Sequence, residues 1–182
     1  MLLRRASALA CLLATAVAIA GCGGSSSSGV SPAAYVKSVC NAVGPFEKDI
    51  NTRTSALQTN PSKTPAQGKT ELQGFLSAVA SDTDKALSQL KAAGTPSVSN
   101  GTKIETAIVK AFTQLDSAMK QAATTANSLS TTSVSAFQSG ATSLGTTVKN
   151  SMSGIGSSLT GLKSPALEKA AAKEPACATI NG

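Results

Sequence analysis

The sequence of 182 residues contains neither histidine nor tryptophan, and only 3% of its residues are aromatic. The absence of histidine excludes the Ser-His-Asp and Cys-His arrangements that activate nucleophiles, and it removes the commonest metal ligand. The nine acidic residues are scattered and form no run that resembles a calcium loop. We therefore expect a protein that is not an enzyme, with no catalytic residues, no metal ligands and no cofactor.

One short stretch matches a catalytic element. Ser117-Ala118-Met119-Lys120 has the Ser-x-x-Lys pattern of serine β-lactamases and penicillin-binding proteins, but the companion Ser-Asp-Asn and Lys-Thr-Gly elements are missing. A chain this rich in serine and lysine matches so short a pattern by chance. We interpret the stretch as one turn of a helix with Met119 in the core.

Two pairs of carboxylates stand close together in the sequence. Glu47 and Asp49, and likewise Asp82 and Asp84, are two residues apart within predicted helices. Side chains with this spacing point in different directions from a helix, so neither pair is arranged for acid-base chemistry. We expect these carboxylates to be solvated.

The first residues follow the pattern of an export signal. Arg4 and Arg5 precede the uncharged, apolar stretch Ala6–Ala20. This stretch of about 15 residues is shorter than the roughly 20 residues that a helix needs to span a bilayer. A short membrane anchor that is retained is the alternative, and the paired arginines leave the twin-arginine export route open.

The end of the apolar stretch, Ile19-Ala20-Gly21-Cys22, resembles the lipobox of bacterial lipoproteins. In that family the cysteine thiol receives a diacylglyceryl group, and a peptidase cuts directly before the cysteine. The resemblance implies a signal peptide over residues 1–21, lipidation at Cys22, and a location on the extracytoplasmic face of the cell membrane. Lipid chains on Cys22 would anchor the protein, because two acyl chains hold where one exchanges.

The residues after Cys22 predict a flexible tether and then one domain. Gly23–Gly29 consists of glycine and serine alone. Such a stretch has no apolar side chain to bury, so we assign residues 22–31 to the tether. Residues 32–182 are enough for a single domain with its own core.

The chain is basic. It has 16 basic and 9 acidic residues, and removal of Arg4 and Arg5 with the signal leaves an excess of five positive charges. This excess suits contact with anionic lipid headgroups or cell-wall polymers. Binding to nucleic acid is disfavoured, because aromatic residues are few, arginine is nearly absent after Arg5, and the protein is expected to be exported.

Apolar residues recur every three or four positions through residues 32–182, and strand-like alternation is absent. This periodicity predicts four long helices and a short fifth helix, at about 36–57, 65–91, 98–129, 137–162 and 165–173. Long helices with short connections are typical of a bundle. The predicted fold is all-α: an antiparallel up-and-down four-helix bundle with a short C-terminal helix.

Local signals refine the helix boundaries. Gly44-Pro45 predicts a kink or a break in the first helix. Thr64, followed by proline and then by Gln67, predicts the start of the second helix. Thr102 with Glu105 matches a capping box, which would move the start of the third helix to a later residue.

The predicted fourth helix combines a clear apolar stripe with poor helix formers. Gly140, Gly145, Gly154, Gly156 and Gly161 lie within it. Each glycine costs a helix about 0.5–1 kcal/mol relative to alanine. We expect a helix from the stripe, and we expect it to be the weakest helix of the bundle.

Cys40 and Cys177 are the two cysteines that remain if Cys11 leaves with the signal and Cys22 carries lipid. The compartment outside the membrane permits oxidation, so we expect a disulfide between them. Two separate core cysteines are the alternative, because Cys40 lies beside the apolar stripe of the first helix.

Five residues of the domain, Tyr35 and Cys40 near its start and Pro165, Leu167 and Cys177 near its end, resemble the layout of small helical lipoproteins from actinobacteria. That resemblance implies a helical fold and a place in the cell envelope, and it implies no activity.

The sequence favours a non-catalytic module that binds an envelope protein or a cell-wall component through one face of the bundle. A carrier of an apolar small molecule or lipid, held between the helices, is the alternative. An enzyme ranks below both, because its acid-base pair would have to come from the few carboxylates and lysines.

Overall fold

The computed structural model describes residues 29–59, 64–159, 162–178 and 180. Cys22, the signal peptide predicted for residues 1–21 and most of the predicted tether lie outside the described residues. Over the described residues the chain forms helices and no strand, as predicted. The helices are α1 (Pro32–Thr59), α2 (Pro65–Ala92), α3 (Gly101–Ala126), α4 (Val134–Leu159), α5 (Pro165–Ala171) and the short 3-10 helix η1 (Pro175–Cys177).

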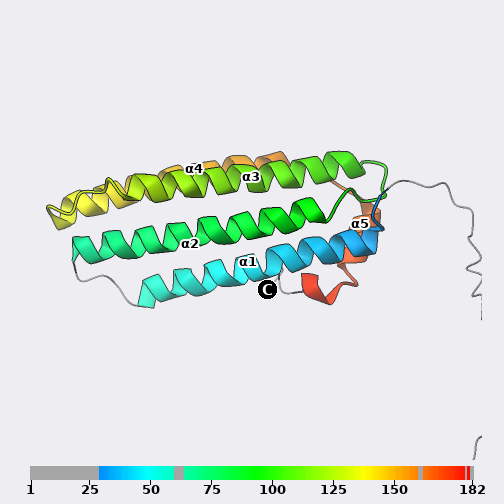
Figure 1. The fold of residues 1–182 in the computed structure, drawn as a ribbon, viewed down its shortest axis with the longest axis horizontal. Coiled ribbons are helices and arrows are strands. Elements are labelled where there is room, and N and C mark those ends of the chain that lie inside the picture. Colours follow the sequence, from blue (N-terminus) through cyan, green and yellow to red (C-terminus); the bar gives the residue numbers. More distant parts are fainter. Residues whose placement is uncertain (1–28, 60–63, 160–161, 179, 181–182) are drawn as a thin grey trace, which may run out of the picture.

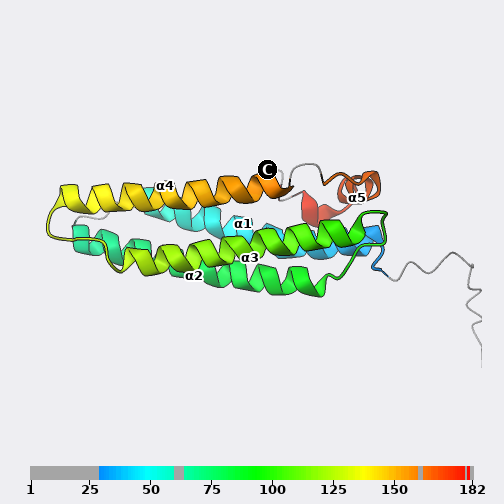
Figure 2. The ribbon, with the colours of Figure 1, turned by 90° about the horizontal axis from the view of Figure 1, so that it is seen from above.

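The four long helices lie side by side and consecutive helices run in opposite directions (Figures 1 and 2). This confirms the predicted antiparallel bundle with a short C-terminal helix. Helix α2 packs against α1 and α3, and α3 packs against α4. Over the residues that the structure describes, α1 and α4 do not form a packed pair. The bundle is therefore open along the side between its first and last long helices.

The main core lies between α2, α3 and α4 and contains many small side chains. Leu76, Val79 and Met119 are buried in it beside three alanines, and Leu144 reaches it from α4. The alanines are Ala80, Ala122 and Ala126. Because a chain with few large apolar residues fills space poorly, its helices pack only where their backbones come close.

A second cluster closes the end of the bundle where α1 begins. Tyr35, Ala93 and Ile104 are buried there, with Leu162 and Leu167 packed against them. Burial, reinforced by the nearby Glu105 carboxylate, raises the pKa of Tyr35 to about 12. The phenol therefore stays neutral and acts as part of the core.

The sequence predicts a kink or a break at Gly44-Pro45. Helix α1 runs through Pro45 without interruption, so the predicted break is wrong, whereas the kink stays a prediction. Proline has no N–H to donate to the carbonyl of Asn41, and this costs the helix one hydrogen bond. Tertiary packing outweighs that loss, because Ala42 and Gly44, which lie between Asn41 and Pro45, are buried.

The predicted cap of α2 is confirmed, whereas that of α3 is wrong. The hydroxyl of Thr64 accepts a hydrogen bond of 3.2 Å from the backbone N–H of Gln67. Helix α3 begins at Gly101, and the Glu105 carboxylate accepts a hydrogen bond of 2.8 Å from the Thr95 hydroxyl outside the helix. A tertiary partner ten residues away has taken the place of the local capping box.

The chain joins the bundle through a short backbone pairing with the connection between α2 and α3. The Val30 N–H donates to the Thr95 carbonyl at 2.8 Å, and the Ser97 N–H donates to the Val30 carbonyl at 2.8 Å. Gly29 lies so close that an added Cβ would be 2.8 Å from the Thr95 carbonyl oxygen. Gly29–Ser31, which the sequence interpretation assigns to the tether, therefore belong to the folded domain.

Helix α4 is the least buried of the long helices. In its described side chains, up to Gly154, Leu144 alone is fully buried. Val134 and Met152 are 57% and 51% exposed. Serine and threonine hydroxyls along α4 donate to carbonyls of the same helix, an arrangement that weakens helices slightly. The low stability predicted for α4 remains a prediction, and its low burial and its hydroxyl-to-carbonyl bonds give a structural reason for it.

Replacing Gly145 with alanine should stabilise the domain, because an added Cβ meets nothing within 4 Å. We expect a gain of about 0.5–1 kcal/mol in the free energy of unfolding, measured by urea denaturation. Amides of α4 should exchange with solvent faster than those of α2 in the wild type, and more slowly in the variant.

The control is Gly101→Ala at the start of α3. Its Cβ would lie 1.9 Å from the Pro96 carbonyl oxygen, so we expect a loss of about 1–3 kcal/mol. A Gly145→Ala variant that is no more stable than the wild type would contradict the account of α4.

Candidate functional site

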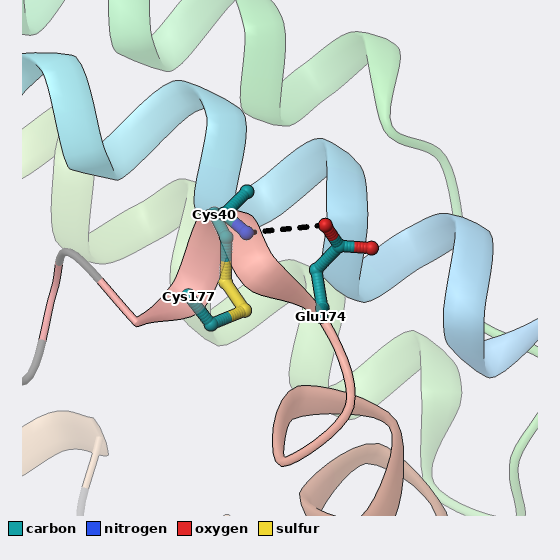
Figure 3. Close-up of a disulfide and its surroundings, with 4 residues drawn as sticks. Cys40, Glu174 and Cys177 are labelled. Atoms are coloured by element: carbon teal, nitrogen blue, oxygen red, sulfur yellow. Dashed lines mark hydrogen bonds between the residues drawn. A yellow bond between two sulfur atoms is a disulfide. The ribbon is translucent and has the colours of Figure 1, made fainter.

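A disulfide joins Cys40 on α1 to Cys177 in η1, as predicted (Figure 3). The two Cα atoms lie 5.0 Å apart, and 137 positions separate the cysteines in the sequence. Both cysteines are buried, together with Val36. The bond therefore ties the first helix to the C-terminal segment and closes a loop that spans nearly the whole domain.

Local capping places Cys177 beside α1. The Ser164 hydroxyl accepts from the Leu167 N–H at 3.5 Å where α5 begins. The Glu174 carboxylate accepts from the Ala176 N–H at 3.2 Å where η1 begins (Figure 3). Both α5 and η1 pack on α1. The disulfide is buried, and the chain has no Cys-x-x-Cys pair, so we interpret the bond as a structural one that we call the clasp.

Four charged residues link α1 to α2 beside a pocket of about 310 Å³. The Arg53 Nε donates to Asp49, its Nη2 lies 3.7 Å from Asp82 Oδ2, and Lys85 Nζ lies 2.9 Å from Asp82 Oδ1. The Asp82 side chain is only 17% exposed, so the expectation that it is solvated is wrong. Its burial depends on the contact with α1, which the local sequence does not reveal.

These charges balance one another. The hydrogen bond from Arg53 lowers the pKa of Asp49. Each carboxylate has at least one cationic partner. The group is therefore arranged as an ion-pair link between two helices, with no carboxylate left to act as a general acid.

A second ion-pair group joins α2 to α3. Lys120 Nζ lies 2.8 Å from Asp116 Oδ2 and 3.5 Å from Asp84 Oδ1. Asp116 is only 8% exposed, and no donor among the described residues reaches its Oδ1. The sequence reasoning missed Asp116, although its position four residues after Phe112 and three before Met119 places it on the apolar stripe. The hydrogen bond with Asp116 raises the pKa of Lys120, so this amine stays charged.

The Ser-x-x-Lys stretch does not form a catalytic pair. The Ser117 hydroxyl donates to the Thr113 carbonyl at 3.0 Å, within its own helix. Lys120 is held by the two aspartates instead of facing the serine. Met119 is buried in the core, as the sequence interpretation expects.

A groove of about 360 Å³ lies between α3 and α4. Leu129, Leu144 and Val148 form its apolar part together with small residues. Gly140 on α4 leaves room for the side chain of Leu129 in the connection between α3 and α4, because a Cβ there would lie 2.7 Å from Leu129 Cδ2. Most of the groove belongs to residues 121–148, a stretch that contains no charged residue.

The polar rim of this groove consists largely of hydroxyl groups that already donate hydrogen bonds within their own helices. Thr125, Thr147 and Ser151 donate to backbone carbonyls four residues earlier, at 3.0, 3.1 and 3.1 Å. Each oxygen keeps lone pairs that accept hydrogen bonds. The groove therefore offers apolar contact and several hydrogen-bond acceptors.

Comparison of the chain with models of known protein families, with curated proteins and with solved structures found no match. Over the described residues, no three histidine, cysteine or acidic side chains lie together as a metal site would require. In the same part of the chain, no helix has the length and apolar character needed to cross a membrane. The described part of the chain is a helical bundle with a disulfide between Cys40 and Cys177 and a groove lined by uncharged residues.

Removing the clasp with Cys40→Ala and Cys177→Ala should destabilise the domain. The chain-entropy model gives about 4.7 kcal/mol for loops of roughly 100 residues, and measured losses range from about 2 to 5 kcal/mol. Trypsin should then cut at Lys169 and Lys173, because α5 and η1 lose their covalent link to α1.

The wild type treated with a reductant is the matched control, and it should behave like the double variant. Unchanged unfolding in both samples would show that packing alone holds the C-terminal segment. Peptide mapping without reduction checks the Cys40–Cys177 bond directly.

Proposed function

We propose that the chain is a lipoprotein anchored by lipid on Cys22, and that its bundle is a non-catalytic binding module of the cell envelope. The observation that carries this proposal is the sequence Ile19-Ala20-Gly21-Cys22 at the end of a short apolar stretch. The disulfide between Cys40 and Cys177 supports it, because such bonds persist in oxidising compartments.

The groove between α3 and α4 is the proposed binding face. It lies in the half of these helices near their connection, at the opposite end of the bundle from α5 and the start of α1 (Figures 1 and 2). An anchored chain would present that half to the envelope. Its apolar lining and its hydroxyl acceptors suit an uncharged segment of an envelope protein.

The groove also favours the alternative function, a carrier of an apolar small molecule or lipid. A volume of about 360 Å³ falls within the range of small-molecule sites, which starts near 300 Å³. The lining by Leu129, Leu144 and Val148 would bury part of an apolar ligand.

Cys22→Ser should abolish lipidation and block processing, because a serine hydroxyl is too weak a nucleophile to receive the diacylglyceryl group. The wild-type protein should partition into the detergent phase of Triton X-114, and mass spectrometry should find the lipid on Cys22. A wild-type protein that stays in the aqueous phase would contradict the lipoprotein proposal.

A photo-crosslinking amino acid at Ser143, which lines the groove, should capture a specific envelope protein in intact cells. The same amino acid at Ser88, an exposed serine on α2, is the matched control and should not. Capture of a small apolar molecule at Ser143 would favour the carrier. Equal adducts at both positions, or none at Ser143, would contradict the proposed face.

A further inference from the structure

Six exposed lysines gather around one end of the bundle. They come from the start of α1, the end of α2, the start of α3 and the region of α5, elements that meet at the same end in Figure 1. We call this group the basic end; it consists of Lys37, Lys91, Lys103, Lys163, Lys169 and Lys173. These lysines are far apart in the sequence, so only the fold brings them together.

Little negative charge opposes the basic end. Its acidic residues are Glu105, Glu168 and Glu174, which leaves an excess of three positive charges. Glu105 and Glu174 are half-buried and accept hydrogen bonds from Thr95 and Ala176. In the described part of the chain, none of the six lysines forms an ion pair; the ion pairs there use Arg53, Lys85 and Lys120.

The chain enters the folded domain at this same end. The pairing of Val30 with Thr95 and Ser97 holds the entry point against the connection between α2 and α3. Six residues lie between Cys22 and Gly29. The seven Cα–Cα steps that join the two residues span at most about 25 Å when fully extended. If lipid is attached at Cys22, as proposed above, the basic end can reach no farther than this from the bilayer. The anionic surface attracts charges over roughly one Debye length, about 8 Å at physiological salt.

We propose that the basic end is a docking surface for anionic phospholipid headgroups. It orients the bundle with its long axis away from the bilayer, so that the uncharged residues 121–148 lie on the side away from the membrane. Anionic lipid is favoured over a cell-wall polymer because the entry point ties this end, and not the opposite one, to the bilayer. The proposal rests on the lipid anchor at Cys22.

The test uses the lipidated protein in phosphatidylcholine vesicles with or without phosphatidylglycerol, and measures lysine acetylation by mass spectrometry. Lysines of the basic end should react several-fold more slowly in the anionic vesicles, because each lysine near the surface contributes about fivefold in affinity. Lys48 and Lys149, which lie elsewhere on the bundle, should react at equal rates in both. High salt should remove the difference.

Charge reversal separates docking from general attraction. In anionic vesicles, the double variant Lys91→Glu, Lys103→Glu should lose the protection. Its remaining lysines of the basic end should be acetylated as fast as in neutral vesicles. The matched control, Lys48→Glu with Lys149→Glu, changes the net charge equally and should keep the protection. Circular dichroism checks that both variants stay folded.

Each remaining outcome has a definite meaning. Equal acetylation in both kinds of vesicle, or uniform protection of all lysines, overturns the docking proposal and leaves the anchor intact. Protection of the basic end only when an anionic wall polymer is added overturns it in favour of that polymer. A protein without lipid on Cys22 overturns the anchor as well, and mass spectrometry of the same sample shows this directly.

Discussion

The close approach of α2 and α3 supports the rest of the fold. Their shared core contains Ala80, Ala122 and Ala126, and Ala126 is fully buried. Small side chains give little transfer free energy individually, so they stabilise a bundle only if backbones come near enough for dense packing. The other long helices are added to this pair from either side. Over the described residues α1 and α4 do not form a packed pair. Helix α4 therefore depends mainly on α3, and α1 depends on α2, α5 and η1.

This dependence explains where the structure uses stronger links. Helix α1 is tied to α2 by Arg53 and Asp82, and to η1 by the Cys40–Cys177 bond. Helix α4 has no such ion pair or disulfide among its described residues. Its glycines lower its helix propensity, and its hydroxyls donate hydrogen bonds to carbonyls of the same helix. We therefore predict that α4, which lines the proposed binding groove, changes its position more easily than the other long helices.

Charged residues are distributed unevenly along the bundle. Exposed lysines surround the end where the chain enters at Val30, whereas residues 121–148 at the other end carry no charge. If the proposed anchor at Cys22 is present, this distribution favours docking of the basic end on an anionic bilayer and leaves residues 121–148 away from it. The disulfide lies near the basic end and keeps α5, which carries Lys169, on the bundle.

Periodic apolar residues determined the helices, because a stripe that repeats every three or four positions can be buried only by a helix. The pairing of Cys40 with Cys177 followed from the count of cysteines and the expected compartment. Caps formed by neighbouring residues, such as Thr64 with Gln67, were also within reach of the sequence. Only the tertiary structure decided that α1 continues through Pro45, that Asp116 is buried and Asp82 half-buried, and that Glu105 accepts a hydrogen bond from Thr95. Each of these depends on a neighbour from outside its own helical turn, and the energy of such a contact exceeds the local preference that the sequence displays.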